Sequence, residues 1–115
     1  MTSDFSLREI GGFQFENLIR NRIPFLLFNL GADTKGLFPS YHQGHLERQT
    51  IQGSQDEAVI KIREAAAPAE QAIVLLSQDG RSCELVATQL EEAGYTNVYW
   101  VKGGMNSLRQ EITGG

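Results

Sequence analysis

One stretch, from Ile73 to Gly104, constrains the fold more than any other part of the chain. It begins with four apolar, mostly branched residues (IVLL at 73–76), a pattern typical of a short strand that is buried on both faces. Polar and flexible residues follow at 77–82, and from Cys83 the apolar residues recur with helical spacing as far as Gly94. The apolar sequence VYWV at 98–101 predicts a second strand. A strand, a helix and a strand in this order predict a right-handed crossover between two parallel strands.

The remainder of the chain supplies the other elements of such a sheet. Three segments are predicted upstream: a short strand within 5–10, a helix at 13–20 and a central strand at 25–29. Ser54 and Glu57 have the spacing of a capping box and predict the start of a helix that Pro68 ends. We expect this helix to bury Val59, Ile62 and Ala66. We therefore predict one α/β domain over residues 1–115, a three-layer α/β/α sandwich with a mostly parallel sheet of about five strands.

Composition excludes several classes of function. The chain has 10 basic and 14 acidic side chains, a net charge of −4 and no basic run, which argues against a nucleic-acid partner. No apolar run approaches the ~20 residues that a membrane helix requires. The first residues lack the pattern of a signal peptide, and one cysteine cannot form an internal disulfide. We therefore expect a cytoplasmic protein that binds neither nucleic acid nor membrane.

The end of the organising stretch carries a resemblance to a known family. Residues 94–104 read GYTNVYWVKGG, which is similar to the Gly-Tyr-x-Asn-Val-Tyr-x-Leu-x-Gly-Gly segment of single-domain rhodaneses, a family of sulfurtransferases. Gly44 and His45 resemble the family's Gly-His-Ile turn, and Leu108 stands where the family usually has a tryptophan. The resemblance covers nearly the whole chain. It implies a rhodanese-like fold with its site in the loop after the 73–76 strand.

The resemblance also assigns the residues of that loop. The family has Cys-x-x-Gly-x-Arg-Ser there, and this chain has, in order, Ser77, Gln78, Asp79, Gly80, Arg81, Ser82 and Cys83. Ser77 therefore takes the position of the catalytic cysteine, Ser82 that of the arginine and Cys83 that of the serine. Sulfur transfer in the family proceeds through a cysteine persulfide, which a serine hydroxyl cannot form. The loop is expected to keep its geometry, with Ser77 in a shallow cup of backbone N–H groups, and to lose its chemistry.

The predicted function is accordingly a catalytically inactive rhodanese-like domain that acts as a binding or regulatory module for an unidentified protein partner. Weak anion binding at residues 77–83 is a further expectation, because a helix N-terminus follows the loop. Asp79 opposes such binding and Arg81 partly offsets it. The alternative function is a thiosulfate sulfurtransferase or another thiol enzyme that uses Cys83, whose pKa a helix N-terminus would lower. The competing interpretation of Cys83 is a small residue that fills a half-buried helix position.

Other chemistry-bearing residues receive structural interpretations. His42 and His45 lack a third strong ligand nearby, so we expect neither a metal nor a cofactor. Tyr99 is expected on the face of its strand opposite Trp100, and Trp100 in the core. The two C-terminal glycines are interpreted as a frayed end.

Overall fold

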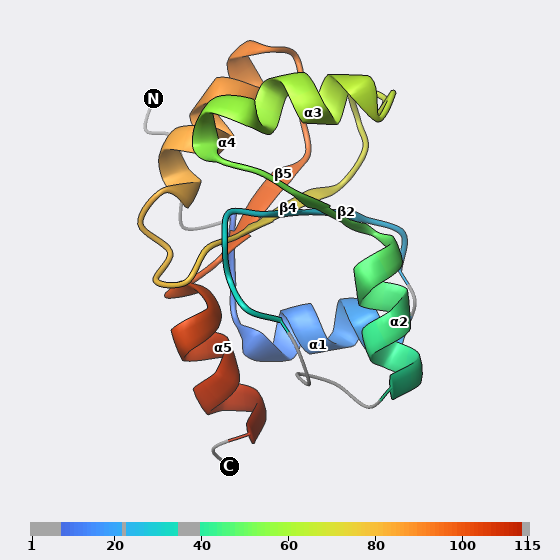
Figure 1. Ribbon diagram of the computed structural model, residues 1–115, viewed down its shortest axis with the longest axis vertical. Helices are drawn as coiled ribbons and strands as arrows, with labels where there is room; N and C mark the ends of the chain where they lie inside the picture. The colour runs from blue at the N-terminus through green and yellow to red at the C-terminus, as the bar shows by residue number, and fades with distance from the viewer. Residues whose placement is uncertain (1–7, 22, 35–39, 114–115) are drawn as a thin grey trace.

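Five parallel strands form a single sheet in the computed structural model, which describes residues 8–21, 23–34 and 40–113 (Figure 1). The order across the sheet is β1-β5-β4-β2-β3, and every neighbouring pair is parallel. The strands are β1 (Glu9–Ile10), β2 (Leu26–Asn29), β3 (Thr50–Gln52), β4 (Ile73–Leu76) and β5 (Val98–Val101). The three strands predicted to be central, β2, β4 and β5, are adjacent, which confirms that prediction. The predicted α/β fold is confirmed, and its sheet is parallel throughout.

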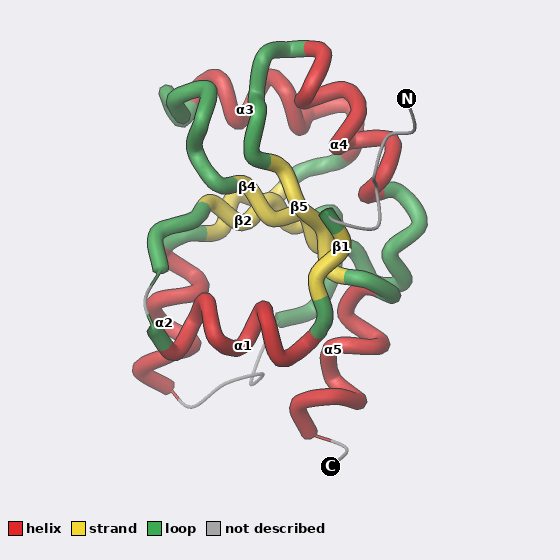
Figure 2. Tube along the Cα trace, turned by 180° about the vertical axis from the view of Figure 1, so that it is seen from behind, coloured by secondary structure: helices red, strands yellow, loops and turns green. Residues whose placement is uncertain are grey.

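Helices cover both faces of this sheet, as the opposite views in Figures 1 and 2 show. One face carries α1 (Gly12–Arg20), α2 (Ser40–Arg48) and α5 (Gly104–Thr113). The other carries α3 (Ala58–Glu64), preceded by a 3₁₀ turn (Gln55–Glu57), and α4 (Cys83–Glu92). The result is the predicted three-layer arrangement.

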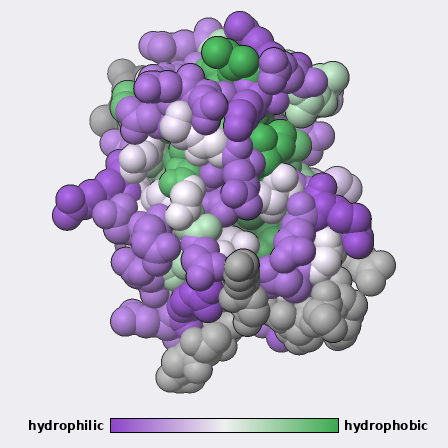
Figure 3. Space-filling view, in the orientation of Figure 1, coloured by the Kyte–Doolittle hydropathy of each residue, from purple (hydrophilic) through white to green (hydrophobic). Residues whose placement is uncertain are grey.

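The apolar run at β4 explains why layers form on both sides. All four of its residues are buried. Because side chains alternate along a strand, Val74 and Leu76 join the core under α1, α2 and α5, while Ile73 and Leu75 join the core under α3 and α4. The outer surface is correspondingly polar. Figure 3 shows one face that is mostly hydrophilic, with its hydrophobic side chains in small separate groups.

The predicted turn at residues 42–46 is wrong, because these residues lie inside α2. The resemblance to the family's turn rested on Gly44 and His45 alone. A single glycine inside a helix costs only about 1 kcal/mol, which packing can offset. Here Leu46 is fully buried in the core, and the Thr50 hydroxyl donates a 2.7 Å hydrogen bond to the Leu46 carbonyl near the end of the helix.

The helix after Ser54 begins as predicted but ends early. The Ser54 N–H donates a 2.9 Å hydrogen bond to Glu57 Oε1, as a capping box requires. The helix stops at Glu64, and Ala66 is exposed with a left-handed φ of 59° instead of buried. Proline disfavours helical geometry in the residue before it, so the chain leaves the helix ahead of Pro68. Part of the predicted N-terminal strand, residues 5–7, lies outside the described residues.

Candidate functional site at the carboxyl edge of the sheet

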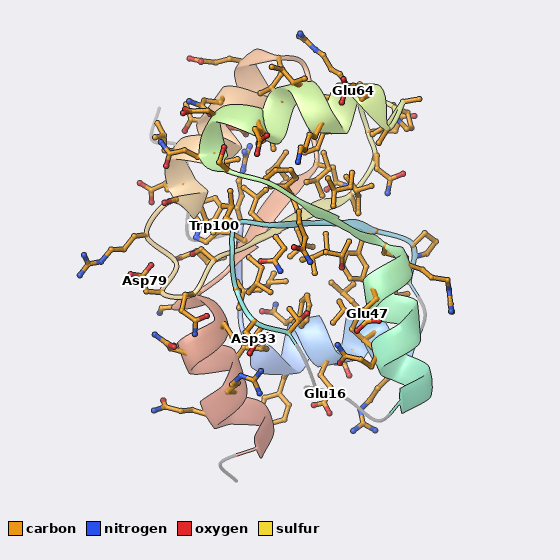
Figure 4. All side chains as sticks on the ribbon, viewed as in Figure 1. Glu16, Asp33, Glu47, Glu64, Asp79 and Trp100 are labelled. Carbon is orange, nitrogen blue, oxygen red and sulfur yellow. The ribbon has the colours of Figure 1, made fainter. Side chains whose placement is uncertain are left out.

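The loop at residues 77–83 joins the carboxyl end of β4 to the start of α4. Parallel sheets of this kind place ligands at that edge. Ser77 is 5% exposed and Cys83 is fully buried, whereas Asp79 and Arg81 are exposed. Figure 4 shows Asp79 at the outer edge of the molecule, with Trp100 further in beside the sheet. The loop therefore has a buried base and an exposed tip.

The base of the loop packs backbone against backbone on Gly103 and Gly104. A Cβ atom on Gly104 would lie 2.4 Å from the Ser77 carbonyl oxygen and 2.5 Å from the Gly80 nitrogen. Gly104 also has a φ of 66°, a conformation that side chains other than glycine rarely adopt. Gly104 thus permits a contact with the loop backbone that any larger residue would prevent.

The first turn of α5 holds the loop from the same side. Met105 and Asn106 donate backbone hydrogen bonds of 2.8 and 3.0 Å to the carbonyl oxygens of Ser77 and Gln78. The Gln78 side-chain amide donates a further 2.7 Å hydrogen bond to Asn106 Oδ1. The N–H groups at this helix start, which have no partners within the helix itself, are therefore used to fix the loop.

Ser77 is bonded within the loop. Its hydroxyl oxygen accepts a 2.7 Å hydrogen bond from the Gly80 N–H and lies 3.6 Å from Cys83 Sγ, which donates to it. The N–H groups of Arg81 and Cys83 donate elsewhere, to the Asp79 carboxylate and to the Gly80 carbonyl. Among the described residues, the Ser77 hydroxyl accepts one backbone hydrogen bond, from Gly80, and the cup of several N–H groups stays a prediction.

At the exposed tip of the loop, Asp79 and Arg81 pair with each other. Asp79 Oδ1 accepts a 3.0 Å hydrogen bond from the Arg81 N–H, and Asp79 Oδ2 lies 3.5 Å from Arg81 Nε. An incoming anion would have to displace the Asp79 carboxylate from both Arg81 donors. As an ion pair in water this contact contributes little to stability, but it sets the local charge close to zero.

Comparison with known proteins identifies the architecture. The Rhodanese-like domain family matches residues 35–111, which include the loop, the glycine pair and most of α5. The chain belongs to this family. No match was found among curated protein sequences.

Solved rhodanese-like structures share the fold at low sequence identity. The rhodanese-like domain of an Anabaena protein, determined in solution by NMR, superposes with a TM-score of 0.67 at 11% identity, covering 90% of this chain and 74% of that one. A human single-domain sulfurtransferase gives 0.61 at 14% identity, covering 87% and 93%. A rhodanese homologue from Thermus thermophilus gives 0.56 at 13%, covering 86% and 98%. At these identities the similarity establishes only the fold of this rhodanese-like domain. Its chemistry has to be inferred from its own residues.

Cys83 is the first residue of α4, as predicted, but its environment is the reverse of an activating one. Burial raises the pKa of the Cys83 thiol above its usual 9.0, and the nearby Asp79 carboxylate raises it further, while hydrogen bonds with Ser77 lower it. The direction is upward because desolvation penalises the charged thiolate most. The prediction that the helix N-terminus would lower this pKa is wrong. Cys83 lies in the core between β4 and α4, in agreement with its interpretation as a packing residue.

The other candidates of this rhodanese-like domain are structural or lie beyond the described side chains. Trp100 and Tyr95 are buried under α3 and α4, and Tyr99 faces the opposite core, as alternation predicted. His42 and His45 lie in α2, with side chains outside the described set. Among the described residues, no group of metal-ligating side chains gathers, and no helix is long and apolar enough to cross a bilayer.

Sequence reasoning missed the second half of the site. Gly103 and Gly104 served to identify the family, but their contact with the loop was not foreseen. The link between Gln78 and Asn106 was missed because the two residues are 28 positions apart and neither belongs to a motif. A pair of glycines directly after a parallel strand is the signal that could have indicated close backbone approach at this edge.

Proposed function

We propose that this rhodanese-like domain transfers no sulfur and acts as a binding module. The observation that carries the proposal is the Ser77 hydroxyl at the base of the loop. It accepts a hydrogen bond from Gly80 and lies against the Cys83 thiol, so an oxygen stands where the family's persulfide chemistry requires sulfur. Among the described residues, the groups hydrogen-bonded to this hydroxyl are an N–H and a thiol, and neither is a general base.

The properties of Cys83 support the same proposal. A nucleophilic cysteine must be accessible and must ionise near neutral pH. Cys83 is fully buried, its pKa is raised by that burial, and its thiol hydrogen is directed to Ser77. An enzyme that used Cys83 would have to open the loop away from α4 before any substrate could reach the sulfur.

A thiosulfate–cyanide assay tests the loss of activity. We expect no thiocyanate formation above the buffer blank from the unaltered chain, and the same result from Cys83→Ala. Turnover by the unaltered chain that disappears in Cys83→Ala would overturn the proposal and establish a thiol enzyme.

Reconstruction of the family loop tests whether only the side chains are missing. The triple variant Ser77→Cys, Ser82→Arg, Cys83→Ser should gain measurable turnover, and adding Asp79→Ser should raise it by removing a carboxylate from the path of the anion. The thiol at position 77 should titrate below the ~8.5 of a free cysteine. Ser54→Cys, which places a thiol at an exposed position outside the loop, is the matched control and should remain inactive. A folded triple variant without turnover would show that the single donor from Gly80 is insufficient.

The binding role is tested at the exposed tip. We expect the double variant Asp79→Ala, Arg81→Ala to lose proteins that the unaltered chain retains from a lysate of its own organism. Ile60→Ala, on the exposed surface of α3, provides the control and should retain them. Equal retention by both variants would exclude the tip as the contact surface.

A further inference from the structure

A cavity of about 310 Å³ lies at the opposite edge of the sheet, between α1 and the amino ends of the central strands. Phe25, Ala72 and Asn97, which directly precede β2, β4 and β5, lie along it. The described residues that line it are Ile10, Gln14, Leu18, Ile23, Phe25, Ala72, Val74, Asn97 and Tyr99. The length of β4 separates Ala72 from Ser77 by roughly 16 Å. The cavity is therefore distinct from the loop at residues 77–83.

The described residues that line this cavity are mainly apolar and uncharged. Ile10, Phe25 and Val74 are buried, while Leu18 and Ala72 are half-buried. None of the nine lining residues carries a charge at neutral pH. A charged ligand would lose its hydration here without gaining an opposite charge, so the lining selects for a neutral ligand. Ile23, 44% exposed, places a large apolar side chain at the entrance.

Three polar side chains in the lining, those of Gln14, Asn97 and Tyr99, provide the hydrogen-bonding groups that could orient a ligand. Gln14 accepts a hydrogen bond from the Gly11 N–H, and Asn97 donates one to the Glu70 carbonyl. The half-buried Tyr99 hydroxyl, in contrast, makes no hydrogen bond to any of the described residues. A ligand group that bonds this hydroxyl replaces a water molecule, so the net gain is that of one neutral hydrogen bond. Tyr99 thus offers a hydrogen-bonding position beside mainly apolar walls.

We propose that this cavity binds a small, neutral, largely apolar molecule with one hydrogen-bonding group directed to the Tyr99 hydroxyl. Its volume falls at the lower end of the roughly 300–1,000 Å³ of ligand pockets, which suits a molecule of about two fused rings. The mixture of apolar walls with a few polar groups, of which the Tyr99 hydroxyl makes no hydrogen bond to a described residue, matches the general composition of such pockets. The site lies outside the rhodanese loop and does not depend on the activity of that loop.

The matched pair 2-naphthol and naphthalene tests the proposal, because the two probes differ by one hydroxyl. Saturation-transfer NMR and titration should show that the unaltered chain binds both, with 2-naphthol the tighter. Ala72→Leu fills the cavity and should weaken both probes at least tenfold. Ala65→Leu makes the same chemical change at an exposed position outside the cavity and should leave both affinities unchanged. If Ala72→Leu does not fold, Leu18→Phe adds bulk from the half-buried rim and carries the same expectation.

Tyr99→Phe tests the direction of binding. Loss of one neutral hydrogen bond should weaken 2-naphthol by about threefold to tenfold and leave naphthalene unchanged. The two Cys83→Ala and Ser77→Ala variants should bind both probes as the unaltered chain does, since they lie at the other edge. The proposal is overturned if neither probe binds the unaltered chain, if the filling variants bind as well as it does, or if Tyr99→Phe weakens both probes equally.

Discussion

The two edges of the sheet are formed by the same strands but differ in packing: close backbone contacts hold the loop at one edge, and side chains line a cavity at the other. At the carboxyl edge, the loop after β4 is held by close backbone contacts with Gly103 and Gly104 and by hydrogen bonds from α5. At the amino edge, side chains alone line the opening under α1, and a phenol is left without a described partner. Backbone packing preserves a shape when side chains change, whereas a side-chain cavity can change in size with one substitution. Four experiments test this difference between the two edges.

The largest effect is expected at Gly104. Gly104→Ala should lower the free energy of unfolding by about 3 kcal/mol, because the new Cβ overlaps the loop backbone and the φ of 66° is unfavourable for alanine. Gly94→Ala is the control: its φ of 104° is also left-handed, but no atom lies within 4 Å of the added Cβ. It should lose only about 1 kcal/mol. Urea denaturation measures both, and equal losses would mean that the backbone contact is not tight.

Removing one hydroxyl from each edge gives the next contrast. Ser77→Ala takes away the acceptor of the Gly80 N–H and should cost about 1 kcal/mol. Tyr99→Phe removes a hydroxyl that has no described partner and should leave the stability of the ligand-free chain unchanged within error. The same urea measurement compares them. A larger loss for Tyr99→Phe would reverse the comparison.

Alkaline pH should weaken the loop edge through Cys83. The folded-state pKa of this thiol is raised by burial, so the unfolded chain releases the proton first as pH rises. The stability from the buried neutral thiol is therefore fully present below the usual value of 9.0 and is lost as pH climbs through the higher folded-state pKa. The free energy of unfolding should fall more steeply above pH 9 for the unaltered chain than for Cys83→Ala. Parallel pH profiles would show that Cys83 ionises freely in the folded state.

The smallest effect is expected at Ala72. Ala72→Val adds two methyl groups beside an existing cavity and raises strand propensity. It should be neutral or stabilising by about 0.5 kcal/mol, in contrast to any enlargement at Gly104. Thermal unfolding measures the change. A loss comparable to that of Gly104→Ala would mean that the amino edge is as tightly packed as the other.

The sequence predicted most of the fold because local patterns and global packing agree. β2, β4 and β5 are nearly continuous apolar runs, and such runs are favoured only in strands covered on both faces. The end of α4 at Glu92, two residues before the left-handed Gly94, followed equally directly from that glycine. The prediction was wrong at 42–46 because the resemblance there rested on Gly44 and His45 alone, while the segment lies inside α2. It was wrong at Ala66 because the helix ends at Glu64, ahead of the restriction that Pro68 imposes.

The site was less predictable because it depends on contacts between distant segments. The positions of Ser77 and Cys83 followed from the resemblance, but the burial that raises the pKa of Cys83 comes from the packing of α4 on the sheet. The backbone hydrogen bonds from Met105 and Asn106 to the loop join segments that are almost thirty residues apart. The amino-edge cavity has no sequence signature, since its lining comes from single residues of several elements.

The burial of Cys83 has a practical consequence, because it is the chain's sole cysteine. A thiol reagent can modify it only when α4 and the loop separate from the sheet. The labelling rate therefore measures how readily that opening occurs. Under conditions where reclosing outpaces the reagent, the rate divided by that of an unstructured thiol gives the equilibrium fraction of open molecules. Comparison with the fraction unfolded in urea then distinguishes local loosening of this edge from global unfolding. The native Cys83 thiol thus reports local opening at one site, and no additional labelling position has to be engineered.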